Sequence, residues 1–64
     1  MLKVLLSLMN SEVRVQITEG DYVNPTVIFT GKAYEVPASL LRRSIDPNGV
    51  YVYNNTLDVH LVRG

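Results

Sequence analysis

The feature that most limits the fold of this chain is a hairpin pattern in residues 50–61. Apolar and polar residues alternate on both sides of Asn54 and Asn55. Asparagine tolerates the positive φ that a type I′ turn requires, so these two residues predict a two-residue turn. The turn sets four pairs of residues directly opposite each other, which are Val50 with Val59, Tyr51 with Asp58, Val52 with Leu57 and Tyr53 with Thr56.

This register separates an apolar face from a polar face, because directly opposed residues share a face of the sheet. A slip of one residue would turn the apolar set to solvent, so the pairing is strongly specified. We expect Val52 and Leu57 to be buried opposite each other, and Tyr51 and Asp58 to stay more exposed. The apolar face holds Val50, Val52, Leu57, Val59 and Leu61. The polar face holds Tyr51, Tyr53, Thr56, Asp58 and His60.

The N-terminal segment has a helical period. Apolar residues recur at i, i+3, i+4 and i+7, which predicts a short helix over residues 2–9. A buried strand is the alternative, since two turns of helix are marginal on their own. The residues expected to face the core are Leu2, Leu5, Leu6 and Met9. Val4 and Leu8 lie outside this stripe, on a side where a surface helix is normally polar.

The middle of the chain has the pattern of a second hairpin. Residues 12–18 alternate between polar and apolar side chains and predict a strand. A loop bounded by Gly20 and Pro25 leads to a second strand at residues 26–34, which is rich in β-branched and aromatic residues. Its predicted core-facing residues are Val27, Phe29 and Ala33, with Ile28 on the other face and Gly31 as a candidate bulge.

A second short helix is expected after this hairpin. Pro37 suits the first turn of a helix, where the missing N–H carries no cost. Leu40 and Leu41 would then face the core, and the two arginines that follow would lie beside the negative end of the helix. Residues 46–49, with the sequence DPNG, predict a turn.

These elements predict the α+β class, with a small antiparallel sheet of about four strands in two hairpins and two short helices over one face. The length predicts a single domain, 1–64. A core of this size supplies only about 3–5 kcal/mol of stability, and the chain has no cysteine for a disulfide. The absence of cysteine and the brief apolar start point to a cytoplasmic protein, mature from Met1 and without a membrane span.

Two stretches, LLSLMNSEVRVQI and VIFTGKAYEVPASLL, precede the two closing strands. Together they resemble a group of small uncharacterised proteins encoded by phages, prophages and mobile elements of Gram-positive bacteria. In that group a leucine-rich helix precedes a polar strand, and a strand with Gly-Lys leads into a proline-containing turn of helix. The resemblance covers most of the chain apart from the loops EGDYVNP and DPNG. It brings no activity and no catalytic residues with it.

The sequence offers no recognisable catalytic or metal-binding constellation. Asp58 and His60 stand two apart on the polar face, but a metal site needs further ligands, and the chain has no second histidine and no cysteine. The serines lack a nucleophile-elbow motif, and there is no glycine-rich phosphate loop. We therefore expect no enzymatic activity, no metal and no cofactor.

The polar hairpin face is the candidate binding surface. Tyr51, Tyr53 and His60 lie on it, and Arg14 lies on a neighbouring strand. Tyrosine and arginine are enriched at interface hot spots, so we expect an unknown protein partner to bind here. The alternative is a nucleic-acid-binding module in which these side chains stack on single-stranded bases. That function needs a basic surround, whereas the net charge is zero and the nearby cations are Arg14, Lys32, Arg42, Arg43 and Arg63.

Val4 and Leu8 predict self-association. Apolar residues on the outer side of the first helix must be covered within the fold or by another subunit, and a twofold homodimer is the commonest closed arrangement. An unpaired edge of the sheet is the alternative surface for such a contact. The sequence thus predicts a small accessory protein that acts by protein binding and forms a homodimer.

Overall fold

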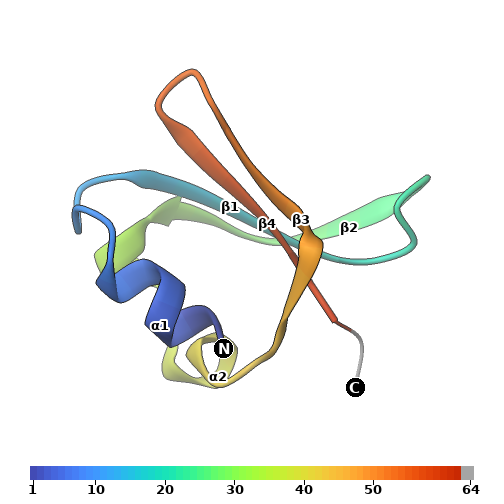
Figure 1. Ribbon diagram of the computed structural model, residues 1–64, viewed down its shortest axis with the longest axis horizontal. Coiled ribbons are helices and arrows are strands. Elements are labelled where there is room, and N and C mark those ends of the chain that lie inside the picture. Colours follow the sequence, from blue (N-terminus) through green and yellow to red (C-terminus); the bar gives the residue numbers. More distant parts are fainter. Residues whose placement is uncertain (63–64) are drawn as a thin grey trace.

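The computed structural model describes residues 1–62. In chain order the elements are α1 (Leu2–Ser7), β1 (Arg14–Gly20), β2 (Pro25–Lys32), the 3₁₀ helix η1 (Ala33–Glu35), α2 (Ala38–Leu41), β3 (Ile45–Tyr53) and β4 (Thr56–Leu61). Both α-helices lie on one side of the four-stranded sheet (Figure 1). The predicted α+β class, with two hairpins and two short helices over one face, is confirmed. The segment at residues 2–9 is a helix rather than a strand, and it ends two residues earlier than predicted.

The strand order is β2-β1-β4-β3, and the sheet is mixed. Each hairpin is antiparallel, as predicted. In the centre, however, β1 and β4 run parallel, with Val15 beside Leu57 and Ile17 beside Val59. The expectation of a wholly antiparallel sheet is therefore wrong. Parallel neighbours need a long crossover connection, and residues 21–55 supply it here.

The core lies between the helices and the two central strands. Leu2 and Leu6 of α1 pack against β1 and β4, which contribute the most deeply buried side chains of the sheet. Leu5 and Met9, also predicted to face the core, pack at its margin and are partly buried. The buried apolar set is completed by Val15, Ile17, Ala33, Val36, Leu57, Val59 and Leu61.

A bulge in β2 changes the face that Val27 occupies. The ladder pairs Thr18 with Val27 and passes over Ile28, which is the extra residue. An inserted residue turns the part of the strand before it to the other face. Val27 therefore lies on the side away from the helices and is 53% exposed, so its predicted core position is wrong. Phe29, beyond the bulge, packs against the core as predicted.

The C-terminal hairpin has the predicted register at all four pairs. Asn54 and Asn55 have φ values of 48° and 59°, as a type I′ turn requires. Leu57 is buried, with 1% of its surface exposed, but Val52 opposite it is 67% exposed, so the predicted burial of Val52 is wrong. The reason is that β3 is an edge strand and the tip of the hairpin projects away from the helices (Figure 1).

The predicted turn at residues 46–49 is instead a bulge within β3. β3 pairs with β4 at Ile45 and again from Val50 onward. Residues 46–49 therefore stand opposite a single residue of β4, His60. The Asn48 N–H donates to the Asp46 carboxylate across the bulge, at 2.9 Å. Gly49 is buried where the bulge passes β4, and a Cβ atom there would lie 2.6 Å from the Cβ of His60. This close approach requires glycine.

Candidate functional site

The side of the sheet opposite the helices, here called the open face, brings the predicted site residues together. Tyr51, Tyr53 and Arg14 are exposed on it. The ladder places Arg14 beside Thr56, which pairs with Tyr53, and it pairs Asp58 with Tyr51. The open face thus carries two exposed tyrosines on β3 and an arginine on β1, with β4 between them.

His60 also lies on the open face, but only 7% of its surface is exposed. Its Nε2 is 2.9 Å from the Gly20 carbonyl oxygen, which can only accept, so Nε2 carries the hydrogen. Its Nδ1 is 2.9 Å from the Thr18 hydroxyl, which donates to it in the neutral ring. The ring of Tyr22 stacks on the imidazole, with 4.4 Å between the ring centroids. The sequence pattern predicted an exposed His60, and this prediction is wrong. The side chain is instead covered and held by Thr18, Gly20 and Tyr22.

Tyr22, in the loop between β1 and β2, is the residue of this face that the sequence pattern does not reveal. Its side chain lies over His60, and its hydroxyl donates a hydrogen bond to the Asp46 carboxylate in the β3 bulge. This bond is the largest of the causes that raise the pKa of Tyr22 from 10.0 to about 12, together with desolvation and the negative charge of Asp46. The same bond lowers the pKa of Asp46, which also accepts the Asn48 N–H. A loop position has no periodicity, so no signal in the sequence indicates where this ring packs.

Between Tyr22 and Tyr51 the open face is hollowed into a recess of about 410 Å³, here called the tyrosine recess. Its floor is formed by β1 and β4 and includes Asp58 and the covered His60. Asp58 is the one charged side chain among the lining residues. The hydroxyl of Tyr53 lies 3.4 Å from the Asp58 carboxylate, and neither ion pair found in residues 1–62 includes Asp58.

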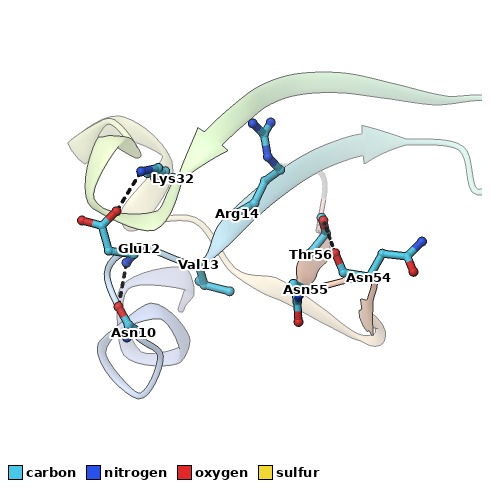
Figure 2. Close-up of a pocket in the computed structure, with 8 residues that line it drawn as sticks. All are labelled: Asn10, Glu12, Val13, Arg14, Lys32, Asn54, Asn55 and Thr56. Atoms are coloured by element: carbon cyan, nitrogen blue, oxygen red, sulfur yellow. Dashed lines mark hydrogen bonds and ion pairs between the residues drawn. The ribbon is translucent and has the colours of Figure 1, made fainter.

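A second recess, of about 440 Å³, lies where the open face ends at the hairpin turn (Figure 2). Lys32 and Glu12 form an ion pair of 2.8 Å on one side of it, and this hydrogen-bonded pairing raises the pKa of Lys32. Arg14 stands between that pair and the turn at Asn54 and Asn55 (Figure 2). Its side chain makes no hydrogen bond or ion pair within residues 1–62. Arg14 is therefore the available cation of the open face.

The open face presents several kinds of polar group to solvent. Its polar groups include tyrosine and threonine hydroxyls, the Asp58 carboxylate, the Arg14 guanidinium, the paired Lys32 ammonium and amides, and its imidazole uses both nitrogens in structural hydrogen bonds. Within residues 1–62, no three or more His, Cys, Asp or Glu side chains are grouped so that they could hold a metal ion. None of the helices in this part of the chain is long and apolar enough to cross a membrane.

Comparison of the chain with protein-family models, curated proteins and solved structures gives no match. The function is therefore inferred from the geometry of the open face itself.

Proposed function

We propose that this protein is a small cytoplasmic accessory protein of mobile-element type that binds a protein partner through the open face. The observation that carries the proposal is a group on a single sheet face of two exposed tyrosines and one arginine that has no ion-pair partner within residues 1–62. Tyr51 is 58% exposed and Tyr53 49% exposed. Tyrosine and arginine are among the residue types that most often dominate binding energy, and strands hold them in place before the partner arrives. The mobile-element assignment rests on the sequence resemblance, and the location rests on the absence of cysteine.

The distribution of charge favours a protein over a nucleic acid as the partner. Affinity for nucleic acid depends on cations that neutralise phosphates. Two of the predicted cations are already in ion pairs, Lys32 with Glu12 and Arg43 with Glu19. Arg42 is exposed and in neither ion pair, but it caps the C-terminal end of α2, on the helix side of the sheet. Asp58, among the tyrosines, repels a phosphate backbone. Arg63, the last of the predicted cations, lies outside the described residues.

Replacing Tyr51 and Tyr53 together with alanine should abolish binding of the partner. Loss of two hot-spot side chains weakens an interface by about 2 kcal/mol or more each, which is at least about 30-fold per residue. The immobilised protein is exposed to a lysate of the source organism, and the retained proteins are quantified by mass spectrometry. Tyr34→Ala is the matched control, because Tyr34 is 62% exposed and lies in η1, outside the sheet.

Equal retention of the same proteins by the parent and by the double variant would contradict the proposal. Circular dichroism of the double variant shows whether it is folded. Titration with fluorescent single-stranded oligonucleotides at low salt tests the alternative. Salt-sensitive binding that the double variant loses would assign the open face to nucleic acid instead.

We also propose that the protein forms a homodimer through the outer side of α1. Val4 is 58% exposed, and Leu8, which caps the C-terminal end of α1, is 79% exposed. Burial of such side chains contributes about 1.5–3 kcal/mol each, before the cost of association. That contribution is comparable to the total of about 3–5 kcal/mol that a core of this size supplies.

Replacing both Val4 and Leu8 with glutamate should therefore give a monomer that melts at a lower temperature. Sedimentation equilibrium measures the mass, and thermal unfolding at the same protein concentration measures the stability. Glutamate at Asn24 and Thr30, which are exposed and away from α1, controls for the added charge. A parent protein that is already monomeric at high micromolar concentration would rule the homodimer out.

A further inference from the structure

The tyrosine recess carries a negative charge that no neighbouring side chain compensates. Asp58 is half-buried at its floor, and the Tyr53 hydroxyl at 3.4 Å is at the long limit of a hydrogen bond. A carboxylate has about four acceptor sites, so most of its capacity is unused by this contact. No lysine or arginine lines the recess, and both ion pairs within residues 1–62 lie elsewhere. Within the described part of the chain, Asp58 is a partly desolvated anion without a cation.

The walls of the recess are aromatic and are held in position. A tyrosine ring has a negative potential over its face, which attracts cations. Tyr22 is fixed by its stacking on His60 and by its hydrogen bond to Asp46. Tyr51 donates from its hydroxyl to the Asn48 carbonyl at 3.0 Å. Because both rings are placed in advance, a ligand between them loses less free energy to ordering of the site.

We propose that the tyrosine recess binds the guanidinium group of an arginine side chain on the protein partner. The inference rests on the proposed function, because it names the group of the partner that the open face takes. A planar guanidinium can stack on a tyrosine ring while its N–H groups bind the Asp58 carboxylate in pairs. A lysine ammonium lacks this plane and holds its water more strongly. The recess volume of about 410 Å³ lies within the range of about 300–1,000 Å³ of small-ligand sites.

Titration of the isotope-labelled full chain with the peptide acetyl-Gly-Arg-Gly-amide tests the proposal by NMR. The amide signals of Gly49 and Asp58 should shift, with a dissociation constant of about 1–10 mM. The matched peptide with lysine should bind at least about threefold more weakly. The peptide with citrulline, the uncharged isostere of arginine, should bind at least about tenfold more weakly. Equal binding of either matched peptide would overturn the assignment to guanidinium.

Asp58→Asn keeps the shape of the side chain and removes its charge, so it should weaken binding of the arginine peptide at least about tenfold. Asp21→Asn is the matched control, because it makes the same change beside Tyr22 in a residue that does not line the recess. This control should keep the dissociation constant within about twofold of the parent value. Thermal unfolding establishes that both variants are folded. Equal affinity of the parent and Asp58→Asn would overturn the proposal.

Failure of this proposal can be distinguished from failure of the wider function. If Asp58→Asn retains the partner as well as the parent does, while the double tyrosine variant loses it, the arginine site is wrong and protein binding stands. If the arginine peptide shifts Gly49 and Asp58 in the parent but not in Asp58→Asn, the arginine site stands even where no partner is retained.

Discussion

Replacing Leu57 with alanine should lower the free energy of unfolding by about 2–5 kcal/mol, whereas the same change at Val52 should lower it by about 0.5 kcal/mol. The two residues oppose each other in the C-terminal hairpin and belong to one alternating pattern. Leu57 is 1% exposed within the core, and Val52 is 67% exposed on the edge strand. Truncation of a buried side chain leaves a cavity, whereas truncation of an exposed one leaves space that water fills.

Urea unfolding followed by circular dichroism, at one protein concentration, measures both variants against the parent. A core of this size supplies only about 3–5 kcal/mol, so the Leu57 variant should retain at most about 3 kcal/mol and unfold at a much lower urea concentration than the parent. The Val52 variant should keep a midpoint close to that of the parent. Equal losses at the two positions would mean that Val52 is covered in solution, which contradicts the exposed tip of the hairpin.

The difference between Leu57 and Val52 shows which structural features an alternating pattern can predict. Alternation and the two asparagines determine which residues oppose each other, because the period and the turn are local properties. Burial depends on what lies over the strand, and the helices cover the centre of the sheet rather than the tip of β3 (Figure 1). The register could therefore be predicted from the sequence, whereas the exposure of the Val52 side chain could not.

The same distinction applies to the arrangement of the strands. Both hairpins were predictable, because each joins consecutive strands by a short loop. The parallel pairing of β1 and β4 depends on where the long connection returns, and apolar residues on one face are compatible with either direction. The bulge at Ile28 inserts one residue without a glycine or proline at that position, so the pattern assigned Val27 to the wrong face.

The candidate site was predictable only in its outline. Parity placed Tyr51, Tyr53 and Arg14 on one face, since each belongs to a strand whose period was clear. The burial of His60 was not predictable, because the ring that covers it comes from a loop. Tyr22 reaches His60 from the β1–β2 connection and creates the recess that the strands alone would leave flat.

Gly49→Ala should lower the free energy of unfolding by about 1–3 kcal/mol, although it adds a single methyl group. The added Cβ would lie 2.6 Å from the Cβ of His60, well inside van der Waals contact. Both atoms are attached directly to backbone, so a rotamer change cannot relieve the contact and β3 or β4 must move. Among the described residues Gly20 is the glycine with positive φ, so alanine fits the backbone at position 49 and the cost comes from the contact.

The displacement should also reach Tyr22, because Gly49 belongs to the same bulge as Asp46, the acceptor of the Tyr22 hydroxyl. If the hydrogen bond from Tyr22 to Asp46 lengthens or breaks, the neutral phenol loses part of its stabilisation. The pKa of Tyr22 should then fall from about 12 toward 10.0. Ultraviolet absorbance titration, with Tyr22→Phe to identify the signal, measures this shift. Asn48→Ala is the control, because it changes an exposed side chain of the same bulge and keeps the backbone N–H that binds Asp46. If Gly49→Ala unfolds within about 0.5 kcal/mol of the parent and leaves the Tyr22 titration unchanged, the close packing of β3 against His60 is wrong.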